Sequence, residues 1–428
     1  MSRKLLKSTA TVGSMTLLSR ISGLVRDMVF AYIMGSSWVA DAFFVAFRIP
    51  NLFRRIFAEG AFSQAFVPVL SERREAGSPA EVRAFVDHTA GWLGGALLVL
   101  TTLGIAFAPA VVSLIAPGFH SKPEQFGLTV DALRITFPYL LCISLVAMSA
   151  GVLNTWGRFA APAVTPVLLN LCLILAAFVF VPWLGNAALG LALGVLVAGF
   201  AQLAFQVPFL RRIDMLPTPR LARGDEPAKR VFKLMMPAIF GASVTQINML
   251  VNTILASFLV TGSVSWLYYS DRLMEFPLGV FGIALATVIL PSLSKLHANG
   301  SPDGFSQLLD WSLRWTCLIG LPASVGLMVL AGPIMTTIFQ YGATTAHDIE
   351  MASRSLVAFG FGLQGFALVK VLAPGFFARQ DTRTPVRIAV IAVTVNIILS
   401  LLLVTVLAHV GLALAISIAA WVNAGLLF

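Results

Sequence analysis

Long apolar runs follow one another along almost the whole chain, separated by short polar or basic segments. A helix needs about 20 apolar residues to cross the hydrocarbon core of a bilayer. Continuous runs of this kind argue against an outer-membrane barrel, whose strands alternate apolar and polar positions over about ten residues. The pattern predicts twelve transmembrane helices, near residues 9–34, 38–70, 90–116, 132–155, 160–181, 187–209, 232–260, 264–292, 311–339, 352–377, 386–407 and 411–428.

The composition supports the same fold class. Of 428 residues, 58% are hydrophobic and only 11% are charged, whereas a soluble domain carries about 25% charged residues. The three cysteines lie in apolar runs, which gives no disulfide framework or zinc spacing. The histidines show no metal-ligand spacing, and the sequence has no phosphate-binding GxxxxGK[ST] loop. We therefore predict an all-α polytopic membrane protein without a metal, a cofactor or an ATPase site.

The basic residues are distributed unevenly along the predicted topology. With the N-terminus in the cytoplasm, 19 of the 29 lysines and arginines lie in cytoplasmic segments and three lie outside. This bias is the positive-inside signal of an inner-membrane protein, so the net charge of +10 does not indicate nucleic-acid binding. Seven basic and five acidic residues remain within the predicted spans, which leaves the membrane interior with a net positive charge.

The chain also shows signs of an internal duplication. Pro68 and Pro291 follow equivalent spans at an offset of 223 residues, and Pro162 and Pro385 repeat that offset. A shift of six helices preserves orientation, which predicts two parallel six-helix lobes around a central cavity, as in secondary transporters. We expect an N-lobe at 1–210, a basic cytoplasmic linker at 211–231 and a C-lobe at 232–428.

The charged residues within the spans are candidates for a functional site, because a charge at the bilayer centre costs at least about 2.5–3.5 kcal/mol. Helical spacing groups them into three stripes, one in each of the first, second and eighth spans. The stripes contain Arg20 and Asp27; Asp41, Arg48, Arg55 and Glu59; and Arg272 and Glu275.

Two interpretations of these charges remain open. They can be structural ion pairs between helices, and the arginines near helix ends, Arg54 and Arg55, can reach an interface instead of a cavity. The excess of arginine over lysine favours a second interpretation, because a guanidinium matches phosphate oxygens with a rigid fork. A net positive cavity then indicates an anionic, phosphorylated substrate. It argues against an exporter of cationic drugs, and the acids do not cluster as in a membrane-embedded transferase.

Several segments resemble one known family. They are SRISGLVRD at 19–27, DAFFVAFRIP at 41–50, NLFRRIFAEGAFSQAFVP at 51–68, SWLYYSDRLMEFPLGVFGIAL at 265–285 and LAPGFFARQDTRTPV at 372–386. These segments resemble the MurJ (MviN) lipid II flippases of bacteria, in the multidrug/oligosaccharidyl-lipid/polysaccharide exporter superfamily. The resemblance implies a flippase that moves lipid II, the undecaprenyl-pyrophosphate-linked disaccharide pentapeptide, from the cytoplasmic to the periplasmic leaflet. The alternative is an ion-coupled exporter of another polyprenyl-linked sugar or of a drug.

The resemblance also implies the site residues. Its cavity arginines fall on Arg20, Arg26, Arg54 and Arg272, and its cavity acids on Asp41 and Glu59. The helical wheel alone favours Arg55 over Arg54, and we follow the family at this position. Secondary candidates are Arg48, Arg55, Asp27 and Glu275.

We expect alternating access of the two lobes around the cavity, with Asp41 and Glu59 competing for the arginines to release the substrate. We expect a monomer in the lipid bilayer, with a coupling ion or the membrane potential driving the return step. Family members usually carry two more helices that hold the prenyl tail. Because this chain ends at Phe428, we expect a headgroup site without that tail groove.

Overall fold

The computed structural model describes residues 3–55, 62–220 and 226–428. Helices make up 88% of the structure, and the described residues contain no strand. The chain divides into two compact units. Unit 1 comprises Met1–Ile33, Ala42–Ile115 and Phe119–Gln246, and unit 2 comprises Met34–Asp41, Ala116–Gly118 and Ile247–Phe428. The all-helical polytopic class predicted from the sequence is confirmed.

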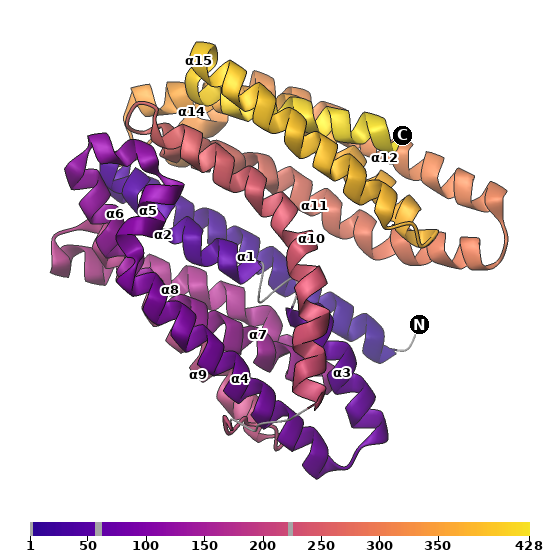
Figure 1. The fold of residues 1–428 in the computed structure, drawn as a ribbon. Coiled ribbons are helices and arrows are strands. Elements are labelled where there is room, and N and C mark those ends of the chain that lie inside the picture. The colour runs from indigo at the N-terminus through magenta and orange to yellow at the C-terminus, as the bar shows by residue number, and fades with distance from the viewer. Residues whose placement is uncertain (1–2, 56–61, 221–225) are drawn as a thin grey trace. The chain divides into compact units, whose positions relative to one another are not determined.

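Unit 1 is built from the helices of the first half of the chain (Figure 1). They are α1 (Arg3–Met34), α2 (Trp38–Phe53), α3 (Ser63–Ala76), α4 (Pro79–Ala106), α5 (Ala108–Ile115), α6 (Pro123–Thr136), α7 (Tyr139–Thr155), α8 (Ala160–Leu184), α9 (Ala187–Arg211) and the first part of α10 (Glu226–Ser257). Helix α9 packs against α6, α7 and α8. At Gly194 it approaches α8 so closely that an added Cβ would collide with the Cβ of Ala176. Small residues of this kind let helices pack closely in a membrane.

Unit 2 contains the last part of α10 and the helices that follow it. These are α11 (Ser263–Ala298), α12 (Pro302–Val329), α13 (Ala331–Phe339), α14 (Ala346–Ala378) and α15 (Arg383–Leu427). Helix α14 is central, because it packs against α11, α12, α13 and α15. The turn between α1 and α2 and the start of α2 also belong to this unit.

Each of the twelve predicted spans overlaps one or two of these helices, and four of them are broken into two. The second span consists of α2 and α3, and the others are α4 with α5, α6 with α7, and α12 with α13. A proline accompanies three of these breaks, since it lacks an N–H and is most easily accommodated in or before the first turn of a helix. Pro109 and Pro333 lie in the first turns of α5 and α13, and Pro138 directly precedes α7.

The last two predicted spans are two helices within α15, which meet at a kink where Ala408 has non-helical backbone angles (φ 48°, ψ −128°). Figure 1 draws its two segments side by side in gold and yellow. Within the described residues, seven helical segments are long and apolar enough to cross a membrane. Helix α1, which carries Arg20, Arg26 and Asp27, is not among them.

The predicted linker at 211–231 is described in part. Thr218 donates from its backbone N–H and its hydroxyl to the buried carboxylate of Asp87 on α4, at 2.7 Å each. The backbone N–H of Arg220 donates to the Asp87 carbonyl at 3.2 Å. These contacts fix the start of the linker on unit 1. The units divide between Gln246 and Ile247, inside α10, and the predicted lobe boundaries stay a prediction.

Candidate functional site

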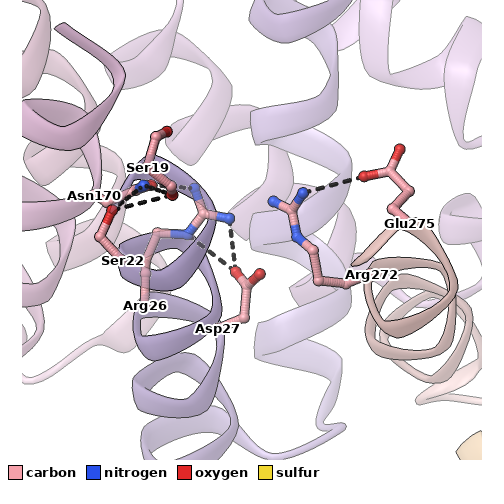
Figure 2. A network of polar contacts seen from close by, with 7 residues as sticks. All are labelled: Ser19, Ser22, Arg26, Asp27, Asn170, Arg272 and Glu275. Atoms are coloured by element: carbon pink, nitrogen blue, oxygen red, sulfur yellow. Dashed lines mark hydrogen bonds and ion pairs between the residues drawn. The ribbon is translucent and has the colours of Figure 1, made fainter. Parts of the chain in front are cut away.

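Arg26 on α1 is the most fully buried of the predicted site arginines, with 4% of its surface exposed. Its Nε and Nη2 both donate to Oδ1 of Asp27, at 3.0 and 2.6 Å. Its Nη1 donates to Oδ1 of Asn170 at 3.0 Å, and its guanidinium lies over the ring of Phe30. Figure 2 shows Arg26 with Asp27 and Asn170. Acceptors on two sides of the guanidinium therefore fix the orientation of its plane.

The second acceptor, Asn170, reaches Arg26 from α8 and also binds the backbone of α1. Its Nδ2 donates to the carbonyl of Ser19 at 3.0 Å and to Oγ of Ser22 at 2.9 Å. Helix α8 is itself held to α9, because Gln202 and Gln206 donate to the carbonyl and hydroxyl of Thr165 at 2.8 and 3.2 Å. Arg26 is thus attached to a framework of three helices.

Arg20 lies six residues before Arg26 on α1 and is half-buried. Its Nε is buried and has no hydrogen-bond partner among the described residues. A buried guanidinium N–H without an acceptor is unfavourable. An anionic oxygen that approached Arg20 would satisfy this donor.

Arg272 on α11, in unit 2, is in a more open environment. Its Nη1 lies 3.3 Å from Oε2 of Glu275, and the two side chains are 35% and 41% exposed. The guanidinium also lies 5.8 Å from the centroid of the Tyr268 ring. Figure 2 shows the ion pair with Glu275. Because this pair is partly solvated, it exchanges partners more readily than the buried pair of Arg26.

Arg54 and Arg55 follow the end of α2 in a π-helical turn. Arg54 is half-buried, and its Nε donates to Oδ1 of Asn51 at 3.1 Å, whereas Arg55 is exposed. The environment thus distinguishes the two neighbours, and Arg54 is the less solvated one. Arg48 is half-buried within α2. The predicted acid Glu59 lies outside the described residues.

Asp41 is buried, and its carboxylate accepts hydrogen bonds from backbone and side-chain donors at the start of α11. Oδ2 accepts from the N–H of Gly262 at 2.7 Å. Oδ1 accepts from the N–H and hydroxyl of Ser265, at 2.9 and 2.6 Å. The first N–H groups of a helix have no partner within it, and they favour a negative charge. Asp41 therefore stabilises the start of the helix that carries Arg272.

The described contacts pair the arginines with Asp27 and Glu275, the two acids predicted only as secondary candidates. Sequence reasoning missed Asn170 and Asn51 entirely. Asn170 has a signal in the sequence, because it interrupts an apolar run 226 positions before Asn396, which interrupts another. Arg26, Arg54 and Arg272 therefore have defined partners, two carboxylates and two amides, within their own units.

Among the described residues, no group of three histidines, cysteines or acids is arranged to hold a metal ion. The site instead consists of guanidinium groups. A neutral amide holds Arg54, a carboxylate holds Arg272, and one group of each kind holds Arg26. Such groups suit an anion with several oxygens, such as a phosphate or pyrophosphate.

Comparison with known proteins gives consistent results. The profile of the family described as Lipid II flippase MurJ matches residues 30–428. A MurJ protein of Vibrio cholerae is 48% identical over 434 aligned residues, which cover 100% of this chain and 83% of that protein. The Lipid II flippase MurJ of Burkholderia cenocepacia is 45% identical, over 99% of this chain and 83% of its own length.

Solved structures show the same relationship. A structure of a lipid II flippase MurJ in an inward closed conformation is 30% identical, with a TM-score of 0.86 over 97% of this chain and 86% of that chain. An inward-facing multidrug resistance transporter of the MATE family has a TM-score of 0.77, over 97% of this chain and 95% of that one. At 15% identity, this second likeness concerns the fold alone.

Proposed function

Because the chain belongs to the MurJ family of lipid II flippases, we propose that its half-buried and buried arginines bind the pyrophosphate of lipid II. The chain is a lipid II flippase, a multi-pass transporter of the bacterial inner membrane and not an enzyme. It supplies the lipid-linked precursor for peptidoglycan synthesis, and thus serves cell wall biogenesis and cell shape.

The pyrophosphate is the part of the substrate that most needs the protein. Transferring an isolated ionised group out of water into a medium of low dielectric costs tens of kcal/mol in the absence of a partner. Arginine compensates for this cost better than lysine, since its planar fork can donate two parallel hydrogen bonds to phosphate oxygens. We assign this task to Arg20, Arg26 and Arg54 of unit 1 and to Arg272 of unit 2.

The observation that carries the proposal is the state of the two arginines on α1. The guanidinium of Arg26 is held in plane by Asp27 and Asn170 before any substrate binds. Arg20 on the same helix has a buried Nε without a partner among the described residues. One arginine is thus oriented in advance and the other gains an acceptor on binding. Both features raise affinity for an anion, because less ordering is required and an unsatisfied donor is removed.

The acids have separate tasks in this proposal. Glu275 is a partly exposed partner of Arg272, so a substrate oxygen can displace it, and it can return to Arg272 when the substrate leaves. Asp41 stabilises the start of α11, where Gly262 and Ser265 donate to both of its carboxylate oxygens. Glu59 keeps its expected role as a competitor for the arginines.

We further propose that the two lobes alternate in access as a monomer, without nucleic acid. The return step is driven by the membrane potential or by a coupled ion. Moving one elementary charge across a potential of about 100 mV provides about 2.3 kcal/mol. Flipping in vesicles with a potassium-diffusion potential, compared with vesicles at zero potential and with an imposed sodium or proton gradient, separates these energy sources.

The test is a leaflet-specific accessibility assay in proteoliposomes that contain fluorescent lipid II. Alanine at Arg20 or at Arg272 is expected to abolish flipping. Arg314→Ala is a matched control, because Arg314 forms an i,i+4 pair with Asp310 on α12 and its side chain is 79% exposed. This control should flip lipid II at the wild-type rate. Wild-type flipping by Arg20→Ala or Arg272→Ala would contradict the proposed arginine site.

A further inference from the structure

Asn170 on α8 provides the neutral acceptor for a buried arginine, and it does so with a side chain that also joins two helices. We propose that Asn170 is a positioning residue for substrate recognition: it holds the guanidinium of Arg26 in the orientation that receives the pyrophosphate. This inference rests on the proposed function of Arg26. It adds a residue that neither the helical wheel nor the family motifs indicated.

The hydrogen bonds of Asn170 determine which way its amide points. Arginine can only donate, so the atom 3.0 Å from Arg26 Nη1 must be the amide oxygen. The Ser19 carbonyl can only accept, so the atom 3.0 Å from it must be the amide nitrogen. The second N–H of that nitrogen is directed to Oγ of Ser22. Reversing the amide would place donor against donor and acceptor against acceptor, so the contacts of Asn170 with α1 specify one orientation of the acceptor for Arg26.

The charge of this acceptor matters because the site is buried. Arg26, Asp27 and Asn170 are 4%, 0% and 5% exposed. Asp27 already neutralises the charge of Arg26, and a second carboxylate would make the cluster anionic and repel a pyrophosphate. An amide fixes the remaining side of the guanidinium without adding charge. Asn170 therefore orients Arg26 without making the cluster anionic.

The second half of the chain provides an internal comparison. Asn396 on α15 donates to the side chain of Asn248 on α10. These two residues lie 226 positions after Asn170 and Ser22, respectively. The residue 226 positions after Arg26 is Asn252, whose Oδ1 accepts from Ser400 at 3.1 Å. An asparagine that joins two helices is thus common to both halves, whereas the contact with an arginine occurs at Asn170. Asn170 thus joins two helices as Asn396 does, and in addition it contacts an arginine. Asn396 is therefore the matched structural control for Asn170.

The experiment is a double-mutant cycle on lipid II binding by the purified full chain in nanodiscs, with fluorescent lipid II as the probe. Asn170→Ala is expected to raise the Kd about tenfold, the usual effect of losing a hydrogen bond to a charged group. Asn396→Ala is expected to stay within about twofold of wild type, because its contact involves no arginine. In an Arg26→Ala background, Asn170→Ala should change the Kd less than about twofold, since the two residues act through one contact.

The outcomes separate the two levels of the proposal. Equal effects of Asn170→Ala and Asn396→Ala, or an undiminished effect of Asn170→Ala in the Arg26→Ala background, would overturn the positioning role. An unchanged Kd for Arg26→Ala alone would instead overturn the proposed arginine site. Should Asn170→Ala fail to fold, Asn170→Asp retains the size and the acceptor for Arg26, while it adds a negative charge and loses the donor to the Ser19 carbonyl. It is expected to weaken binding at least about tenfold at neutral pH. Wild-type affinity of this variant would contradict the role given to the neutral amide.

Discussion

Two arginine–carboxylate pairs, one in each unit, use the same chemical groups in different surroundings. Arg26 and Asp27 are 2.6 Å apart with side chains 5% and 0% exposed, whereas Arg272 and Glu275 are 3.3 Å apart with side chains 35% and 41% exposed. Arg26 also donates to the neutral amide of Asn170 from a second helix, whereas Glu275 lies one turn from Arg272 on the same helix. The first pair is fixed by the helix framework, and the second can exchange partners. In the proposed function, Arg26 is a recognition group prepared in advance, and Arg272 is one that rearranges during transport.

The largest expected effect comes from breaking the buried pair. Arg26→Ala leaves the carboxylate of Asp27 buried without its counter-charge, which destabilises a protein by about 3–5 kcal/mol. We expect flipping to fall below detection together with a large drop in thermal stability. Unfolding of the purified variant in nanodiscs and the leaflet assay measure the two effects. Wild-type stability of Arg26→Ala would contradict a stabilising role of the buried pair of Arg26 and Asp27.

Breaking the exposed pair separates transport from stability. Arg272→Ala is expected to abolish flipping but to change the stability by less than about 1 kcal/mol, because partly solvated ion pairs contribute little. The same two measurements apply. A loss of stability as large as that of Arg26→Ala would remove the proposed difference between the two pairs.

Lysine substitutions sharpen the comparison, because they keep the charge and remove the fork. Arg26→Lys cannot reproduce bonds to both Asp27 and Asn170 in the same geometry, and we expect a loss of about tenfold in lipid II affinity. Arg272→Lys should lose only about threefold, since a single flexible contact tolerates a point charge better. Binding of fluorescent lipid II in nanodiscs gives both ratios. A larger loss of affinity for Arg272→Lys than for Arg26→Lys would contradict the proposal that Arg26 is the arginine with the fixed geometry.

The smallest effect is expected at Glu275. Glu275→Gln removes the charge that competes for Arg272, which should raise lipid II affinity by about twofold, in line with the modest strength of an exposed pair. Glu275→Asp keeps the charge and is the control. A loss of affinity in Glu275→Gln would indicate that Glu275 orients Arg272 instead of competing for it.

The sequence predicted the helical fold well, because long apolar runs leave a membrane chain few other structures. It predicted single helices where the structure has breaks near Phe107, Pro138 and Leu330, since a count of apolar residues does not register the effect of proline on the backbone. The kink at Ala408 appeared in the sequence only as a boundary between two apolar runs.

The site was predicted in part, and its partners less well than its arginines. Successive residues on a helix point in different directions, so the wheel grouped Asp27 with Arg20 and not with its neighbour Arg26. The long arginine side chain nonetheless reaches Asp27, which periodicity does not indicate. Asn170 is 144 residues from Arg26, and Asp41 is 221 residues from Gly262. Contacts of this kind depend on how helices pack, which no local pattern contains.

The central claim is that arginines recognise the pyrophosphate of the substrate. The most direct measurement compares the Kd of undecaprenyl pyrophosphate with that of undecaprenol, which has the same tail and no phosphate, for the wild type and for Arg26→Ala. We predict that the wild type prefers the pyrophosphate by about 100-fold or more, as two charge-assisted hydrogen bonds would give, and that Arg26→Ala loses most of this preference. An equal preference in the two proteins would contradict the account.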